Sequence, residues 1–183
     1  MRKRECPELC DDQVRLRALA VTDVKALMDA TSDADIPKFT YWPARMSRSQ
    51  AQARVEQAAR GWDECSRLEF AVTKLDSNRL IGFAGLAPEW EAGVGEVFYW
   101  TAPWARRRGV AVRSVRLLCA WAFEELGIKT LRLETDADNI GSRRVAEVAG
   151  FTHEGLRKSQ RVRADGSRCD SVIYVRGEPR NWP

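Results

Sequence analysis

The fold is decided by a stretch in the middle of the chain, Glu96-Val97-Phe98-Tyr99-Trp100-Thr101-Ala102-Pro103-Trp104-Ala105-Arg106-Arg107-Arg108-Gly109-Val110-Ala111. Its β-branched and aromatic residues predict a strand over 95–101, which Pro103 closes. A basic turn follows, and Gly109 begins a helix whose apolar residues recur at helical spacing: Val112, Val115, Cys119, Ala122 and Leu126. The stretch therefore predicts a strand, a tight turn and a long helix in direct succession.

The start of this helix is a candidate anion site. A helix N-terminus offers free backbone N–H groups at the positive end of the helix dipole. The small residues Gly109 and Ala111 let a pyrophosphate approach that backbone, and Arg106, Arg107 and Arg108 add positive charge. The alternative is an ordinary helix start with a solvated run of charge. The stretch is not a Walker loop, because no Gly-Lys-Ser/Thr follows, and Gly93-Val94-Gly95 is not a dinucleotide fingerprint, because it precedes a strand.

Working outward, hydrophobic periodicity predicts about seven strands and four helices around one main sheet. The further strands are expected over 14–19, 70–75, 80–87, 130–135, 156–163 and 169–175. The helices are expected near 24–28, 47–62, 109–126 and 140–149. Residues 36–43 are expected to form an aromatic, Pro-punctuated loop, and Asp165-Gly166 a hairpin turn. The mixed order of elements predicts an α/β (α+β) fold with a mostly antiparallel sheet.

Composition narrows the class of protein. With 183 residues, 44% of them hydrophobic, the chain can bury the core of one domain, predicted over 13–178 between an extension (1–12) and a tail (179–183). The net charge of +4 is too small to indicate a nucleic-acid partner. No apolar run approaches the ~20 residues of a membrane span.

Cysteine usage and the first residues bear on metals and on compartment. Five cysteines without metal-ligand spacing, and one histidine, predict no metal site. The charged first residues precede no apolar signal core, so we expect a cytoplasmic protein with reduced thiols.

The motif Arg106-x-x-Gly109-x-Ala111 resembles the Gln/Arg-x-x-Gly-x-Gly/Ala signature of the GNAT (GCN5-related) N-acetyltransferases. The rest of the family pattern follows at the expected spacing: Trp121 to Gly127, Leu131 to Glu134, Asn139-x-x-Ser142-x-x-Val145, and Gly150-Phe151 with Glu154-Gly155. The likeness covers roughly residues 68–175. Within the family, the sequence is similar to the RimJ/RimL-like branch, which contains the ribosomal-protein alanine acetyltransferases. The motifs specify the superfamily but not the acceptor.

The resemblance implies one GNAT-type domain that binds acetyl-CoA and no metal. In this family the strand before the signature splays from its neighbour, and the pantetheine arm pairs with its exposed backbone. The cofactor would therefore contact Tyr99, Trp100 and Thr101 along the strand, then Arg106, Arg107, Arg108, Gly109, Val110, Ala111 and Val112 at the pyrophosphate, and Asn139 at the pantetheine.

The implied acceptor is a primary amine, of a protein N-terminus or a small molecule, that attacks directly in a ternary complex. No cysteine falls beside the implied site, which disfavours an acyl-cysteine route. The alternatives are a non-catalytic CoA-binding module of the same fold and, more remotely, a nucleic-acid binder. No membrane partner is expected, and a homodimer stays open.

Acetylation needs a neutral amine, and at pH 7 only ~0.04% of a lysine side chain is neutral, against ~10–17% of an α-amine. A positioned base therefore helps. The resemblance implies Glu134, five residues before Asn139. Glu96 is the rival, because it shares a strand face with Phe98 and Trp100. For each, the alternative is an ordinary solvent-facing carboxylate.

The departing thiolate needs a hydrogen-bond donor. Many members of the family supply a tyrosine at the position that is Ala146 here, so Ser142 is the candidate donor in this chain. Its alternative is an ordinary hydroxyl near a helix start. Tyr174 is a further candidate donor, with a buried core aromatic on the last hairpin as its alternative.

The family also places the substrate cleft at loops that carry aromatic residues here: Phe39, Tyr41, Trp42 and Trp90. The alternative for these side chains is packing in the core.

Overall fold

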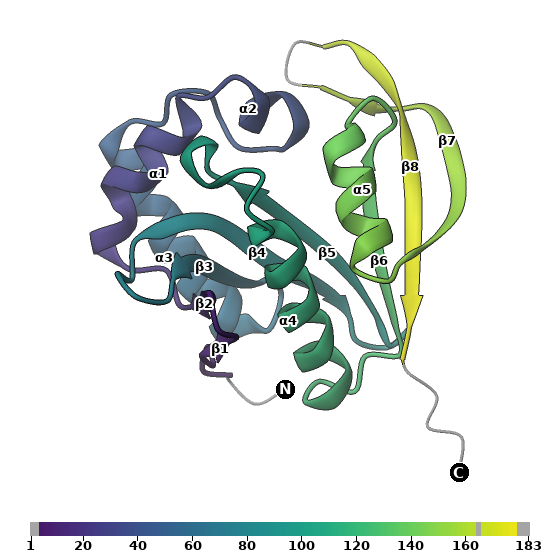
Figure 1. Cartoon of the computed structure of the whole chain (residues 1–183), viewed down its shortest axis with the longest axis horizontal. Coiled ribbons are helices and arrows are strands. Elements are labelled where there is room, and N and C mark those ends of the chain that lie inside the picture. Colours follow the sequence, from purple (N-terminus) through teal and green to yellow (C-terminus); the bar gives the residue numbers. More distant parts are fainter. Residues whose placement is uncertain (1–3, 164–165, 179–183) are drawn as a thin grey trace.

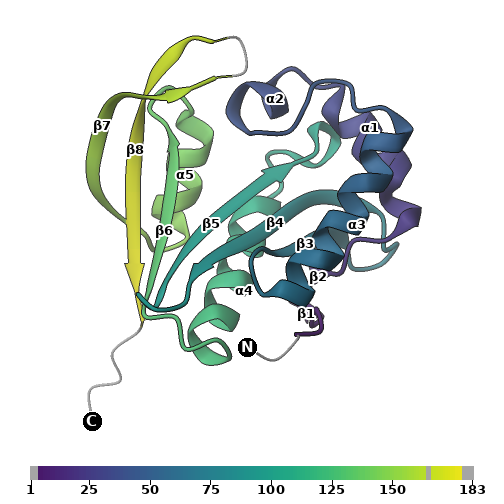
Figure 2. The same cartoon turned by 180° about the vertical axis from the view of Figure 1, so that it is seen from behind.

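The computed structural model describes residues 4–163 and 166–178. Asp165 of the predicted Asp165-Gly166 turn and the predicted tail 179–183 lie outside the described residues. Figure 1 shows the arrangement of the elements from one side, and Figure 2 shows it from behind.

Eight strands form a single sheet in the order β1-β2-β3-β4-β5-β6-β8-β7 within the described residues. They are Leu9–Cys10 (β1), Val14–Arg17 (β2), Leu68–Lys74 (β3), Leu80–Glu89 (β4), Val94–Thr101 (β5), Thr130–Asp136 (β6), Thr152–Val162 (β7) and Arg168–Gly177 (β8). Every neighbouring pair is antiparallel except β5 with β6, which is parallel. The predicted mixed, mostly antiparallel α/β fold is confirmed.

Helices cover both faces of this sheet. They are Val24–Thr31 (α1), Asp35–Phe39 (α2), Arg48–Glu64 (α3), Val110–Glu124 (α4) and Ile140–Val148 (α5). The α4 residues Val115, Leu118 and Cys119 are fully buried in one core, which α5 and its following turn complete. Residues of α1 and α2 and the start of α3 pack with Phe83 and Trp100 in a second core on the opposite face. The two cores hold the central strands between them.

The helix α3 begins with a capping box. The Ser47 hydroxyl accepts a hydrogen bond from the Gln50 amide at 3.2 Å, and the Gln50 side chain accepts one from the Ser47 amide at 2.8 Å. Each side chain satisfies a backbone donor that the first turn of a helix leaves free.

Two predictions about local structure are corrected. Residues 36–43 were expected to be a loop, but α2 includes Pro37 in its first turn, where a proline costs no helical hydrogen bond. Within the expected extension 1–12, β1 pairs with β2, and Asp11 forms an ion pair of 2.8 Å with Arg113 of α4. Both elements depend on partners that are distant in sequence.

The sheet opens between β5 and β6. The two strands pair only from Val94 with Thr130 to Glu96 with Arg132. Beyond Glu96, β5 continues its ladder with β4, and β6 continues with β8, so the two strands diverge (Figure 2). The splayed cofactor strand that the family resemblance implied is therefore present, and its inner backbone edge is left without a strand partner.

Candidate functional site

A cavity of about 1620 Å³ occupies the opening between β5 and β6. Side chains from β5, β6, β7, the α2 loop and the first turns of α4 and α5 line it. Most residues predicted to bind the cofactor or to act in catalysis contribute to this lining, although Arg108 does not: Glu96, Tyr99, Trp100, Thr101, Arg106, Arg107, Gly109, Val110, Ala111, Val112, Glu134, Asn139 and Ser142. Tertiary packing thus gathers the sequence candidates around one space.

The first turn of α4 forms a cradle of backbone donors. Gly109 precedes the helix with a φ of +74°, a left-handed conformation that glycine adopts without steric cost. The first helical hydrogen bond runs from the Arg113 amide to the Gly109 carbonyl at 3.0 Å, so the amides of Val110, Ala111 and Val112 have no intrahelical acceptor.

The space beside the Gly109 Cα is open and lines the cavity. A Cβ atom added to Gly109 would meet no atom of the described residues beyond its own neighbours within 4 Å. Free N–H groups at a helix N-terminus are the donors that phosphate oxygens accept from. The pyrophosphate group implied by the family resemblance therefore suits the residues present.

Arg106 has a further role that the sequence did not indicate. Its guanidinium binds Asp33 at 2.5 Å and Asp35 at 3.0 Å, which ties the turn before α4 to the segment between α1 and α2. Burial tends to raise the pKa of Asp33, but the hydrogen bonds and charge of Arg106 outweigh it and hold the pKa below its ordinary value. Arg107 and Arg108 are exposed beside the cradle.

Tyr99 and Ser142 meet across the opening. The Tyr99 hydroxyl donates a hydrogen bond of 2.9 Å to the Ser142 hydroxyl oxygen. Burial raises the pKa of Tyr99 to about 12, although the contact with Ser142 opposes the shift, so the phenol stays protonated. Asn139 caps α5 by accepting a hydrogen bond of 3.1 Å from the Ser142 amide. This cap fixes the position of Ser142 next to β5.

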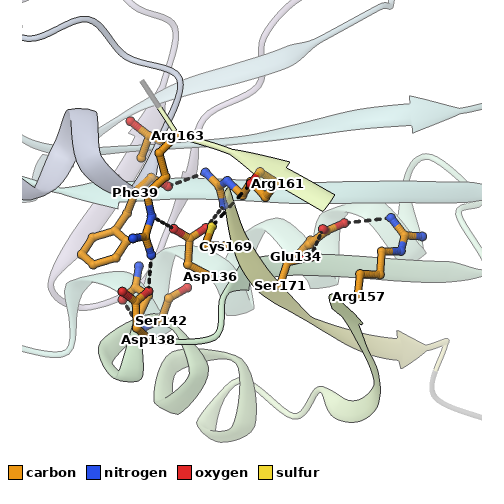
Figure 3. A network of polar contacts seen from close by, with 12 residues as sticks. Phe39, Glu134, Asp136, Asp138, Ser142, Arg157, Arg161, Arg163, Cys169 and Ser171 are labelled. Atoms are coloured by element: carbon orange, nitrogen blue, oxygen red, sulfur yellow. Dashed lines mark hydrogen bonds and ion pairs between the residues drawn. The ribbon is translucent and has the colours of Figure 1, made fainter. Parts of the chain in front are cut away.

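Glu134 lies on β6 with both carboxylate oxygens engaged (Figure 3). Ser171 of β8 donates a hydrogen bond to one oxygen, and Arg157 of β7 forms an ion pair of 3.1 Å with the other. The carboxylate is thus oriented by two neighbouring strands.

Glu96, in contrast, is exposed to the cavity and has no hydrogen-bond or ion-pair partner among the described residues. It is the last residue of β5 in register with β6, so it stands where the sheet divides. Glu134 and Glu96 therefore line the same cavity, but two side chains bind the carboxylate of Glu134 and none of the described side chains binds that of Glu96.

An ion-pair cluster that no sequence motif indicated closes one end of the cavity. Asp136 of β6 is fully buried and pairs with Arg161 at 2.7 Å and Arg163 at 2.8 Å (Figure 3). Arg161 also donates a hydrogen bond of 2.8 Å to the Phe39 carbonyl at the end of α2. The only sequence signal was the spacing of two residues between the arginines and between Asp136 and Asp138, at the ends of the strands β7 and β6.

Aromatic side chains form one wall of the cavity. Trp42 meets Phe83 edge to face at 4.9 Å and Trp100 at 5.2 Å, and all three line the space, as do Phe39 and Tyr41. Trp90 does not line it: its indole donates to the Cys65 carbonyl at 2.9 Å. The family-derived expectation for Trp90 is therefore wrong, because this side chain closes the end of α3 instead.

Two further features bear on the class of site. Within the described part of the chain, no three His, Cys, Asp or Glu side chains are grouped as a metal ion would require. No helix in that part has the length and apolar character needed to cross a bilayer.

The chain belongs to the GNAT acetyltransferases: residues 13–152 match the family described as an acetyltransferase (GNAT) domain. Together with relatives named as N-acetyltransferases, this match identifies the protein as an N-acetyltransferase. An uncharacterized N-acetyltransferase of Bacillus subtilis, YoaA, is 24% identical over 175 residues, which are 95% of this chain and 98% of YoaA.

Solved structures share the fold. RimL, a ribosomal L7/L12 alpha-N-protein acetyltransferase in complex with coenzyme A, superposes with a TM-score of 0.85 at 20% identity, covering 93% of this chain and 98% of RimL. The microcin C7 self-immunity acetyltransferase MccE, in complex with acetyl-CoA and AMP, has a TM-score of 0.83 at 19% identity, covering 91% and 93%. These likenesses show that the chain shares the fold of both enzymes.

Proposed function

We propose that this enzyme transfers an acetyl group from acetyl-CoA to a primary amine, of a protein N-terminus or a small molecule, by direct attack in a ternary complex. One observation carries the proposal: β5 separates from β6 beyond Glu96, and the helix α4 that follows β5 begins with free backbone amides after Gly109. The free inner edge of β5 offers backbone partners to an extended pantetheine arm, and the cradle offers donors to its pyrophosphate. The coenzyme A and acetyl-CoA complexes of RimL and MccE support this assignment.

In this proposal the attacking amine and the departing thiolate lie on opposite faces of the opened sheet. Side chains alternate along β5, so Glu96 and Phe98 face the aromatic wall, whereas Tyr99 faces α5. The amine approaches on the carboxylate side, and the thiolate departs toward the hydroxyl side. The new N–C bond forms as the C–S bond breaks, and the surplus amine proton passes to a carboxylate.

Ser142 is the donor to the leaving thiolate. Tyr99 donates its own hydrogen to the Ser142 oxygen, which leaves the Ser142 hydrogen free to point at the sulfur. No tyrosine is needed at Ala146, which is buried.

Glu134 is the first candidate for the base, on its likeness to the family pattern and its oriented carboxylate. Each of its oxygens makes one of these two contacts and keeps a second lone pair that can accept a proton. Glu96 is the second candidate, favoured by its free carboxylate at the point where the strands divide. In either case the base matters most for an amine that is protonated at neutral pH.

The test is thiol release from acetyl-CoA against a panel of amines and N-terminal peptides, with Glu134→Gln, Glu96→Gln and the exposed Glu124→Gln of α4 as a control. The variant that lacks the base should lose at least tenfold in kcat/KM at pH 7. That loss should shrink at alkaline pH, because the amine then becomes neutral by itself. A fully active Glu134→Gln would remove Glu134 from the mechanism. Absence of turnover with every acceptor, despite binding of coenzyme A, would indicate a non-catalytic module.

A further inference from the structure

The aromatic side of the cavity contains an arginine that the proposed chemistry does not use. Arg67, just before β3, lines the same space as Glu96. Its Nε atom donates to Glu69 at 3.0 Å, and its guanidinium lies 4.1 Å from the centre of the Phe98 ring. The side chain is 51% exposed, and its two terminal nitrogens have no partner in the described ranges. The Nε edge of the Arg67 guanidinium is therefore bound to Glu69, and its two terminal nitrogens are available to a ligand.

The Phe98 ring on which Arg67 rests is itself positioned by a glycine. Phe98 is paired with Gly85 of β4, and a Cβ atom on Gly85 would lie 2.5 Å from two ring carbons. The ring therefore lies across β4 toward β3, over a position where only glycine leaves room. Stacking of a guanidinium on an aromatic face keeps its N–H groups available at the edge.

The charges around Arg67 do not cancel. Arg54 of α3 also binds Glu69, at 2.5 Å, so two guanidiniums share one carboxylate that is only 1% exposed. Both arginines line the cavity, and Arg67, which is 51% exposed against 15% for Arg54, is the more accessible of the two positive charges. Glu96 has no partner and is the free negative charge on the same side.

The separation of these charges follows from strand geometry. Glu96 and Phe98 are two residues apart on β5, so their side chains leave one face of the strand about 7 Å apart. The Phe98 ring extends sideways to Arg67 across β4, and neighbouring strands are about 4.8 Å apart. Arg67 precedes Leu68, which pairs with Leu86 of β4, and the next β4 residue, Ala87, pairs with Glu96, so the backbones of Arg67 and Glu96 lie two strand spacings apart, roughly 10 Å.

We propose that the acceptor carries an anionic group, a carboxylate or a phosphate, roughly 10 Å from its amine, and that Arg67 binds this group. The proposal rests on the proposed function, because it takes the amine to lie beside Glu96. An extended peptide advances about 3.3 Å per residue, so a side chain at the third residue of an acceptor reaches this distance. Arg67 thereby selects the acceptor and orients its amine.

The test compares acetylation of three peptides of one sequence whose third residue is glutamate, phosphoserine or glutamine. The wild type should show kcat/KM about tenfold higher for the two anionic peptides than for the glutamine peptide, mainly through KM. A preference for phosphoserine alone would assign the phosphate, and equal preference would assign either anion. Arg67→Gln should abolish the preference, Arg67→Lys should keep part of it, and Arg67→Glu should favour a peptide with lysine at the third position.

The matched control is Arg60→Gln, which removes an exposed arginine of α3 that does not line the cavity. Calorimetric titration with coenzyme A verifies that each variant is folded and binds its donor. Acetylation of the glutamate and glutamine peptides at equal rates by the wild type would overturn the role of Arg67 while the transferase function stands. A preference that survives in Arg67→Gln would overturn it as well. Failure to acetylate any amine would refute the proposed function itself.

Discussion

Among single residues, Gly109 is the one whose backbone conformation bears most directly on ligand binding. Its φ of +74° lies in the left-handed region, and the space above its Cα is open. Gly127 provides an internal comparison, because its φ is +68° and a Cβ there would also meet nothing within 4 Å. The two glycines share the same conformational demand, but only Gly109 lines the cavity.

Gly109→Ala and Gly127→Ala should each lower the free energy of unfolding by about 1 kcal/mol, because alanine is strained at positive φ. Only Gly109→Ala should also weaken coenzyme A binding, by about tenfold, since its methyl group enters the cradle. Urea denaturation measures the first effect and calorimetric titration the second. Equal coenzyme A affinities in the two variants would show that the pyrophosphate lies elsewhere.

Between elements, the Tyr99–Ser142 hydrogen bond joins β5 to α5 across the opening. Neither β5 nor α5 pairs its backbone with the other, so this side-chain contact and the Asn139 cap set where Ser142 stands. Burial raises the pKa of Tyr99 from its ordinary 10 to about 12. The phenol therefore acts as a hydrogen-bond donor over the whole range in which the enzyme can be assayed.

Tyr99→Phe and Ser142→Ala should each lower kcat by about tenfold, and the double variant should lose little more, because Tyr99 acts through Ser142. The shape of the pH profile from 6 to 10 should be the same in Tyr99→Phe, since the phenol does not ionise there. Additive losses of kcat in the double variant would show that Tyr99 and Ser142 act independently, against this prediction.

Ionisation of Tyr99 should instead affect stability. The unfolded chain releases this proton near pH 10 and the folded chain near 12, so the stabilising contribution is lost as the pH rises between these values. The slope of unfolding free energy against pH in this window should be smaller in Tyr99→Phe than in the wild type.

On the scale of the whole molecule, the β7–β8 hairpin and α2 meet beyond the open end of the sheet (Figures 1 and 2). Arg161 and Arg163 of this hairpin bind the buried Asp136, and Arg161 reaches Phe39. Two guanidiniums thus form ion pairs with one fully buried carboxylate. This cluster connects the part of the sheet beyond β6 to the helices that cover the part before it.

Asp136→Ala should lower the free energy of unfolding by about 3–5 kcal/mol, because it removes the only buried carboxylate that two largely buried arginines share in the described residues. Asp138→Ala is the matched control: this carboxylate also binds Arg163 but is 53% exposed, so its loss should cost at most about 1 kcal/mol. Urea denaturation of the two variants measures the difference. Similar values for both would mean that the buried pair does not hold the two parts together.

The sequence by itself determined the features that depend on neighbours along the chain. The capping box at Ser47, the glycine that begins α4 and the strand before it follow from local propensity and hydrogen bonding. Motif spacing also identified the family, and most of the residues that it predicted for the site line the cavity. Short elements were harder: α2 and β1 form through packing and pairing that no local pattern reveals.

Only the tertiary structure decided how the side chains are used. Glu96 and Glu134 look alike as strand glutamates, but the approach of Arg157 and Ser171 engages one and leaves the other free. Arg67 lies at the cavity on the Phe98 ring, and that ring has room because the residue paired with Phe98 is Gly85. Charge pairing and burial depend on strand register and on which elements pack together, and these contacts join residues far apart in the chain.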